Sequence, residues 1–304
     1  MQEFTLKTIP NLDVCVLAAL ELFSQTKIPQ IKIPFKRSLV VGSGNAAATG
    51  KILFEKADAI FADESTVDIK LKNIKSIDGV VLISASGAKH APIIAKKAKA
   101  KNKKVILLTN TLNSMGSKHA DQTYVFPKNR EPYTYNTSTY MGPIFGYTHE
   151  DPKAIHRYIK TKIDKIKLPN FKKYSRFYFI VPEEFTGIIR LLNVKFIELF
   201  GRRVSRDIET FEYMKHATTI VPSPNELFID FSPDKRKNTK YGEKEHRIHI
   251  PLPKNADYGA MMAIGYYIVG KIQAQKPAWF KKNLQAYMQR VSKEYGYNIP
   301  AIVE

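Results

Sequence analysis

Cysteine is almost absent from the sequence, because Cys15 is the single one in 304 residues. One thiol excludes an intramolecular disulfide, a cysteine-rich zinc site and any redox motif that needs several cysteines. Cys15 stands among apolar residues, within the run from Val14 to Phe23. We therefore expect this thiol to pack in the core.

Long apolar runs are lacking too. No stretch approaches the roughly 20 residues that a membrane-spanning helix needs. The run from Val14 to Phe23 contains Glu21 and follows no basic leader, which argues against a signal peptide. The sequence predicts a cytoplasmic protein without a membrane partner.

Acidic residues are few compared with basic ones: 28 Asp and Glu stand against 48 Lys and Arg, for a net charge of +20. Such a surplus favours anionic partners. Nucleic acid is not the expected one, because the lysines are spread along helix faces and no homeodomain, zinc-finger or RRM signature is present. The densest polar stretch, residues 232–247, is interpreted as an exposed loop between strands. Small phosphorylated substrates fit the charge as well.

One β-strand, helix, β-strand unit stands out in the first half. Residues 80–83 are continuously apolar, which is typical of a parallel strand covered on both faces. Apolar side chains at 91, 94, 95 and 98 then form one helix face, with lysines on the other side, and a second apolar strand covers 105–108. The turn between the first strand and the helix, Ser84 to Gly87, falls at the carboxyl end of a parallel strand.

Such a turn can hold a phosphate. Amide groups at a helix start point outward, the helix dipole adds partial positive charge, and Ser84 and Ser86 supply hydroxyl donors. Gly87 lets the backbone approach an anion closely. The same residues are also common helix caps, so the turn by itself leaves a purely structural role open.

The rest of the first half fits a doubly wound α/β domain of about five parallel strands with helices on both faces. Beyond the unit described above, it is predicted to contain a helix over 11–24, strands over 39–41, 59–61 and 123–126, and a glycine-rich turn that opens a helix after residue 41.

The second half repeats this pattern. A linker helix near 151–165 precedes a break with proline and lysine, so the domains are predicted to span residues 1–165 and 166–304. "RFYFIV" followed by a helix from residue 182 parallels "SLVVGSGNAAATGKILFEKA", which indicates an internal duplication. Further strands are predicted over 219–221 and 227–231, and a long helix over 258–273. The turn "GSG" at 42–44 becomes "PEE" at 182–184, where acidic side chains repel a phosphate.

Four stretches together resemble a known family: "VVGSGNAAATG", the strand ending in "SASG", the strand ending in "LLTN", and "NTSTY". They are similar to the sugar isomerase (SIS) domain. Two such halves in one chain resemble the phosphoglucose/phosphomannose isomerases and the isomerase portion of glucosamine-6-phosphate synthase. The likeness covers roughly Arg37 to Lys282 and implies two flavodoxin-like, parallel-sheet domains.

The resemblance implies a phosphate site in the first domain. The family's Ser-x-Ser-Gly turn, its first glycine-rich turn and its later Ser-Thr pair have counterparts here, and Lys89 stands where the family carries a polar phosphate ligand. The implied phosphate-binding residues are Ser84, Ser86, Gly87, Lys89, Ser138, Thr139, Gly42, Ser43 and Gly44.

The resemblance places the chemistry in the second half. The segments "NVKFIELF", "ETFEYMKHA" and "QKPAWFKKNL" match the family's catalytic segments and identify Lys195, Glu198, His216 and Lys282 as catalytic candidates. Lys195 and Glu198 are also three residues apart on an otherwise apolar helix, which is unusual for charged side chains. Without the resemblance, an ordinary surface ion pair and a structural histidine are the favoured explanations of these residues.

The implied activity is aldose–ketose isomerisation of a sugar phosphate through an enediol. Glu198 is expected to move the proton between C1 and C2, His216 to open the sugar ring, and Lys195 to stabilise the oxyanion. The family needs no metal or nucleotide cofactor, and its double-domain members are homodimers that share the histidine between subunits. A non-catalytic phosphosugar sensor, an amino-sugar phosphate isomerase or deaminase, and a basic nucleic-acid-associated protein remain the alternatives.

Overall fold

The computed structural model describes residues 3–217, 221, 223–232 and 241–304. The chain divides into two compact units. Unit 1 comprises residues 1–21, 129–137 and 150–304, and unit 2 comprises residues 22–128 and 138–149. Each unit contains its own parallel sheet, as predicted from the sequence.

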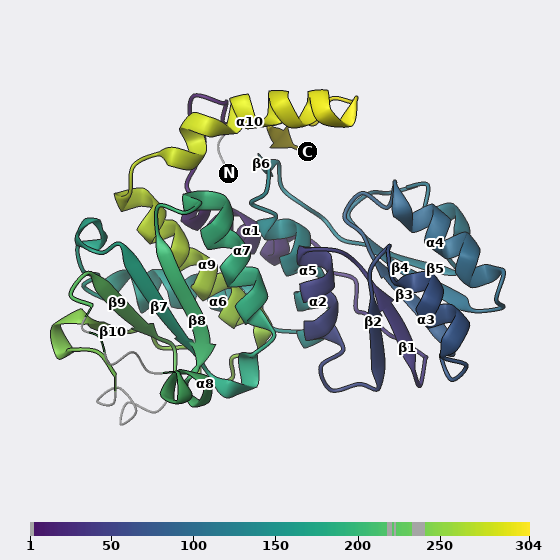
Figure 1. Ribbon diagram of the computed structural model, residues 1–304, viewed down its shortest axis with the longest axis horizontal. Coiled ribbons are helices and arrows are strands. Elements are labelled where there is room, and N and C mark those ends of the chain that lie inside the picture. The colour runs from purple at the N-terminus through teal and green to yellow at the C-terminus, as the bar shows by residue number, and fades with distance from the viewer. Residues whose placement is uncertain (1–2, 218–220, 222, 233–240) are drawn as a thin grey trace. The chain divides into compact units, whose positions relative to one another are not determined.

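Unit 2 is built on a five-stranded parallel sheet in the order β2-β1-β3-β4-β5 (Figure 1). This is the order of flavodoxin-like folds, in which the crevice between the first and third strands is the usual ligand site. The strands are β1 (Ser38–Val41), β2 (Ala59–Ala62), β3 (Gly79–Ile83), β4 (Lys104–Thr109) and β5 (Gln122–Val125). The helices are α2 (Asn45–Leu53), α3 (Val67–Asn73), α4 (His90–Lys99) and α5 (Thr137–Thr148). The first helix, α1 (Leu12–Gln25), contains residues of unit 1 up to Glu21 and residues of unit 2 from Leu22 onward.

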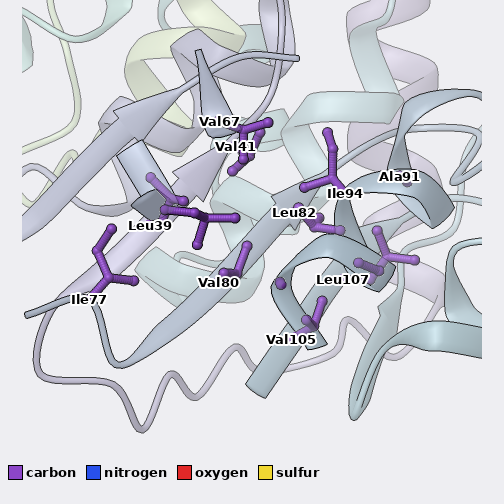
Figure 2. Close-up of a cluster of buried hydrophobic side chains, with 13 residues drawn as sticks. Leu39, Val41, Val67, Ile77, Val80, Leu82, Ala91, Ile94, Val105 and Leu107 are labelled. Atoms are coloured by element: carbon purple, nitrogen blue, oxygen red, sulfur yellow. The ribbon is translucent and has the colours of Figure 1, made fainter. Parts of the chain in front are cut away.

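The core of unit 2 explains why its central strands are continuously apolar. Every residue of β1 and β3 is buried, because helices cover both faces of the sheet. The predicted face of α4 is confirmed: Ala91, Ile94, Ala95 and Ala98 belong to one buried cluster with Val80, Leu82, Val105 and Leu107. Figure 2 shows this cluster. The lysines in the last turn of the helix are exposed.

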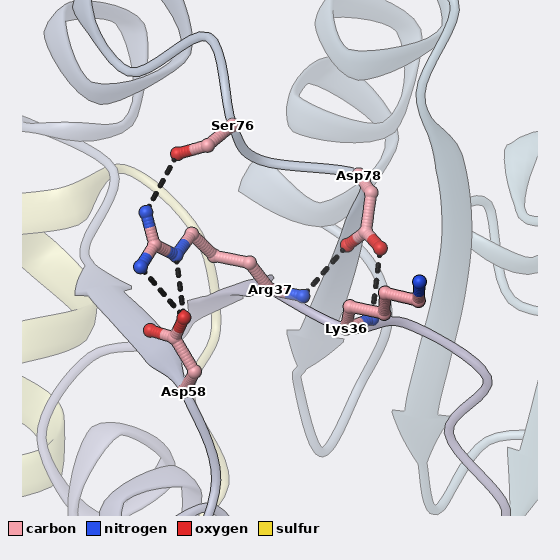
Figure 3. Close-up of polar contacts among 5 residues, drawn as sticks. All are labelled: Lys36, Arg37, Asp58, Ser76 and Asp78. Atoms are coloured by element: carbon pink, nitrogen blue, oxygen red, sulfur yellow. Dashed lines mark hydrogen bonds and ion pairs between the residues drawn. The ribbon is translucent and has the colours of Figure 1, made fainter.

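Polar contacts tie the amino ends of the three strands β1, β2 and β3 together (Figure 3). Arg37 pairs with Asp58 at 2.6 Å and donates to Ser76 at 2.8 Å, and the backbone amides of Lys36 and Arg37 donate to the Asp78 carboxylate at 2.8 and 3.0 Å. These contacts fix the strand register at this edge. The opposite, carboxyl edge is where the candidate phosphate turns follow the strands.

Unit 1 has a four-stranded parallel sheet in the order β10-β9-β7-β8. With β7 and β8 matched to β1 and β2, and β9 and β10 to β3 and β4, the order is that of unit 2, so the predicted duplication is confirmed in the topology. The strands are β7 (Arg176–Val181), β8 (Ser205–Thr210), β9 (Glu226–Asp230) and β10 (Arg247–His249). The helices are α6 (Pro152–Thr161), α7 (Ile188–Phe200), α8 (Phe211–His216), α9 (Tyr258–Gln275) and α10 (Trp279–Tyr295).

Several elements of unit 1 differ from the expectation. A 3-10 turn, Glu183–Phe185, precedes α7, so the helix begins at Ile188 instead of residue 182. Three features were not predicted from the sequence: β8, α10 (yellow in Figure 1), and the antiparallel pair of β6 (Glu131–Pro132) and β11 (Ile302–Val303). The predicted strand over 219–221 lies largely outside the described residues, as do residues 233–240 of the predicted loop between β9 and β10.

Among the residues that the structure describes, the remaining regular elements are short 3-10 turns at Ser117–His119, Ile163–Lys165, Phe171–Lys173 and Lys244–His246. Cys15 is buried, as expected, and burial raises the pKa of its thiol. In the part of the chain that the structure describes, no helix combines the length and apolarity required to cross a lipid bilayer.

Candidate functional site

The Ser84–Gly87 turn of unit 2 lies at the carboxyl end of β3, as predicted. Its two hydroxyl oxygens organise the turn itself: Ser84 Oγ accepts a hydrogen bond from the Gly87 amide at 3.2 Å, and Ser86 Oγ accepts one from the Ala88 amide at 3.3 Å. Ser86 is exposed and Ser84 half-buried. The hydroxyl protons of both side chains therefore remain available for an anion at the turn.

The fold itself requires glycine at position 87, in addition to the close approach of an anion that glycine permits. Its φ is +56°, and a Cβ there would lie 2.3 Å from Ser114 Oγ. The Gly116 amide also donates to the Gly87 carbonyl at 2.7 Å, so the loop after β4 presses against the turn. Only glycine fits this conformation and this contact.

Gly87→Ala is expected to lower the free energy of unfolding by about 2–4 kcal/mol, since alanine adds left-handed strain and a steric clash with Ser114. Gly296→Ala is the matched control: its φ is +72°, but no atom lies within 4 Å of the added Cβ, so only about 1 kcal/mol is expected. Urea unfolding of both variants measures the difference. Equal losses would show that Ser114 places no constraint on the turn.

The glycine-rich turn Gly42–Gly44 follows β1, which is the neighbour of β3 in the sheet. The Ser43 hydroxyl donates to the Glu64 carboxylate, and this bond lowers the pKa of Glu64. Hydrogen bonds from Ser65 and Thr66 lower the pKa of the neighbouring Asp63 to about 2. The resulting hollow of about 360 Å³ is lined by two carboxylates as well as by Lys51. A phosphate is therefore less favoured here than at the Ser84–Gly87 turn.

The other predicted phosphate ligands lie at helix starts in unit 2. Lys89 is exposed at the N-cap of α4, two residues after Gly87. Ser138 and Thr139 lie in the first turn of α5 and not in a loop, and both are buried, with 0% and 9% of their surface exposed.

Lys195 and Glu198 form an ion pair on α7 of unit 1. Lys195 Nζ lies 2.5 Å from Glu198 Oε2, and the same ammonium donates to the Thr134 carbonyl. The Lys195 side chain is 1% exposed and that of Glu198 is 23% exposed, so this is no ordinary surface pair. Burial raises the pKa of Glu198 above its ordinary value of 4.5, although Lys195 and Arg190 act in the opposite direction.

Glu198 lies in the wall of a groove of about 840 Å³ in unit 1. A small core of Ile9, Leu284 and Met288 holds α10 and Tyr133 in place along this groove. Arg203 stacks over the Trp279 ring at 5.6 Å. Aromatic, aliphatic and basic side chains line the groove together with Glu198: Tyr133, Thr134, Ile197–Arg203, Trp279, Phe280, Asn283, Leu284 and Tyr287. A protonatable carboxylate in such a groove can exchange protons with a bound ligand.

The other two catalytic candidates are not beside Glu198 in unit 1. His216 is exposed at the end of α8, which follows the carboxyl end of β8. Glu198 lies near the end of α7, just before the chain enters β8 at its amino end, so the two residues are at opposite edges of the sheet. Lys282 is exposed on α10 and is not among the residues that line the groove.

Several groove residues were not predicted to have a role. Tyr133 lines the groove, whereas Tyr135, two residues later, is fully buried. The helix that carries Trp279 could have been found, because the buried Leu284, Met288 and Val291 follow a helical period. No sequence signal identifies Thr134. Among the described residues, no group of three or more His, Cys, Asp and Glu side chains could hold a metal ion.

Comparisons of the sequence with models of known families and with curated proteins gave no match. Solved structures do match. The C-terminal domain of glucosamine-fructose-6-phosphate aminotransferase from Francisella tularensis is 14% identical, with 89% of this chain and 94% of that chain covered and a TM-score of 0.61. Tagatose-6-phosphate ketose/aldose isomerase from Escherichia coli is 11% identical, with 87% and 86% covered and a TM-score of 0.55.

Glucosamine-6-phosphate deaminase from Thermotoga maritima is 18% identical, with 86% of this chain and 91% of that chain covered and a TM-score of 0.53. At these identities the likeness shows the fold. It confirms the resemblance that the sequence motifs indicated: the chain has the double-domain fold of the sugar isomerase (SIS) proteins.

Proposed function

We propose that the protein is a sugar-phosphate aldose–ketose isomerase of the phosphoglucose/phosphomannose isomerase kind. The observation that carries the proposal is Glu198, a carboxylate with a raised pKa in the wall of a large groove and paired with a buried lysine. Moving a proton between C1 and C2 needs one base that can take it and return it. A carboxylate whose pKa is shifted toward working pH is suited to both steps.

In the proposed reaction, Glu198 removes the proton from C2 of the open-chain aldose and returns it to C1 of the enediolate, while the proton of the C2 hydroxyl passes to O1. Lys195 holds the carboxylate in place and supplies positive charge close to the developing oxyanion. The hydroxyls of Ser84 and Ser86 and the amides of their turn bind the phosphate, with Lys89, Ser138 and Thr139 as further candidates. This remote binding contributes energy that orients the carbon chain.

The direct test is a phosphorus NMR time course of the purified protein with fructose 6-phosphate. Formation of glucose 6-phosphate or mannose 6-phosphate is the expected result. Tagatose 6-phosphate and glucosamine 6-phosphate serve as parallel substrates, and ammonia release from the latter would identify a deaminase instead. Ligand-induced stabilisation without any turnover would refute isomerisation and favour a phosphosugar sensor.

The activity is expected to depend on pH through Glu198. Because only the ionised carboxylate is a base, kcat/KM falls as pH drops through the raised pKa of Glu198. The acid limb of the profile therefore lies above pH 4.5, the ordinary value for glutamate. Initial rates measured over a pH series in constant ionic strength test this. An acid limb at or below that value would show that a different group acts as the base.

His216 is proposed to open the sugar ring in the site of a neighbouring subunit, since it lies at the opposite edge of the sheet from Glu198 within one chain. We expect His216→Ala and Glu198→Gln proteins to be inactive separately and to regain part of the activity after co-refolding. Mixed dimers would contain one site with both native residues. No recovery, with dimers shown by sedimentation, would refute a shared site. Lys282 remains a candidate through the resemblance alone.

A further inference from the structure

The segment from Asn129 to Thr137, called the strap below, belongs to unit 1 although the residues on both sides of it in sequence belong to unit 2. Its first part, β6, pairs with β11 in antiparallel register, Glu131 opposite Val303 and Pro132 opposite Ile302. The Tyr133 amide extends this ladder with a bond of 2.8 Å to the Ala301 carbonyl. The strap is thus anchored at one end by residues 301–303.

The other end of the strap is anchored by buried polar groups. Tyr135 is fully buried, and its hydroxyl donates to the Pro10 carbonyl at 2.9 Å and accepts from Gln273 Nε2 at 2.9 Å. The Glu131 carboxylate accepts a bond of 2.6 Å from the Thr137 amide. With both ends held, the middle of the strap has little freedom to relax.

Thr134 stands in the middle, in an unfavourable conformation. The Tyr135 amide bonds to the Pro132 carbonyl at 3.1 Å, which closes a β-turn with Thr134 in its third position, and the φ of Thr134 is +72°. That position with positive φ ordinarily takes glycine or asparagine, and a β-branched residue is strained there. Such strain persists only where the surroundings enforce it, and it is common at functional sites.

The Thr134 carbonyl is aimed at Lys195. The buried ammonium of Lys195 has three partners: this carbonyl, the Glu198 carboxylate at 2.5 Å, and the ring of Tyr266 at 5.7 Å. Because the Lys195 side chain is only 1% exposed, water is poorly placed to replace a lost partner. A shift of the carbonyl therefore changes how strongly the ammonium acts on Glu198.

We propose that Thr134 is a positioning residue: the strap, clamped by β11, holds the Thr134 carbonyl on Lys195 and thereby sets the orientation and environment of the Glu198 carboxylate. The inference rests on the proposed function in naming Glu198 as the base. It adds that a turn about 60 residues away in sequence controls that base through Lys195.

The contacts of Lys195 indicate in which direction the pKa of Glu198 changes when the Thr134 carbonyl moves away. With the carbonyl withdrawn, the ammonium has one partner fewer and acts more strongly on Glu198. This effect lowers the pKa of Glu198. The other charged or titratable groups around the Lys195–Glu198 pair are Arg190, Arg202 and Arg203 of α7 and the loop after it, Tyr133 of the strap, Tyr266 of α9 and Tyr287 of α10, and none of them is substituted in the variants described below.

The test is an NMR titration of Glu198 in the full chain with carbon-13-labelled glutamate carboxyls, assigned by means of Glu198→Gln. Thr134→Pro forces φ to about −65° and turns the carbonyl away, so the pKa of Glu198 is expected to fall by about one pH unit. Thr134→Gly adopts the native φ without strain, and we expect the wild-type pKa. A folded Thr134→Pro protein with the wild-type pKa would overturn the proposal.

If Thr134→Pro does not fold, a second variant tests whether the strap sets the environment of Glu198. Arg130 ties the strap to Glu304 at 3.1 Å and to the Phe4 carbonyl at 2.7 Å, and it lies outside the groove. Arg130→Ala loosens the strap, so a smaller fall in the same direction is expected, and an unchanged pKa then refutes the proposal. The titration needs no turnover. An inactive wild type that shows these shifts would refute the isomerase function and leave the positioning role intact.

Discussion

Replacing Glu198 with glutamine is expected to lower kcat/KM for sugar-phosphate isomerisation by about two to four orders of magnitude. Glutamine has nearly the same volume, and its carbonyl oxygen can still accept the bond from Lys195. What it loses is the ability to take a proton and return it. Ligand binding, measured as thermal stabilisation by fructose 6-phosphate, should therefore change much less than turnover.

Glu209 offers a matched control for this experiment. Burial and Asp207 raise the pKa of Glu209 as well, but this residue lies on β8 and not among the groove residues. Glu209→Gln is expected to retain wild-type kcat/KM. Wild-type turnover in Glu198→Gln would exclude this residue as the base, and a loss of equal size in both variants would show that the effect is not specific to the groove.

Replacing Phe196 with alanine is expected to lower the free energy of unfolding by about 3–5 kcal/mol. Phe196 is fully buried on α7, and its ring meets those of Phe177, Phe179 and Phe200 at centroid distances of 6.0, 5.2 and 5.4 Å. Alanine leaves a cavity among rings that close packing holds in place. Since α7 carries both Lys195 and Glu198, the loss of packing also loosens the ion pair.

Equilibrium urea unfolding measures the Phe196 effect, and Ile197→Ala is its control on the same helix. Ile197 is 43% exposed, so its truncation is expected to cost about 1 kcal/mol or less. Similar losses in the two variants would contradict the assignment of Phe196 to the core. A loss below about 2 kcal/mol for Phe196 would mean that neighbouring rings collapse into the cavity.

The sequence predicted the fold well where the signal is local. Continuous apolar runs such as residues 80–83 mark strands buried on both faces, and the period of Ala91, Ile94, Ala95 and Ala98 marks the buried face of α4. The edge strand β8 was missed, because "SRDIET" alternates weakly and has charged side chains. The pair of β6 and β11 was missed because two-residue strands separated by 169 positions leave no periodic signal.

The candidate site was likewise predicted in part from the sequence and in part not. The family motifs singled out the Ser84–Gly87 turn and the Lys195–Glu198 pair, and the spacing of the latter placed both charges on one face of a helix. The sequence did not reveal that Lys195 is fully buried, that Glu64 occupies the other glycine-rich turn, or that His216 lies across the sheet from Glu198 within one chain.

By itself, then, the sequence determined the class of fold, the repeat and the residue types available for chemistry, since these depend on side chains a few positions apart. The tertiary structure decided the environment of Glu198. Burial in a groove formed by α7, α10 and the strap raises its pKa, and Lys195, which also donates to the carbonyl of Thr134, acts in the opposite direction. Desolvation and ion pairing act over a few ångströms in space, and the chain reaches those distances only when it is folded.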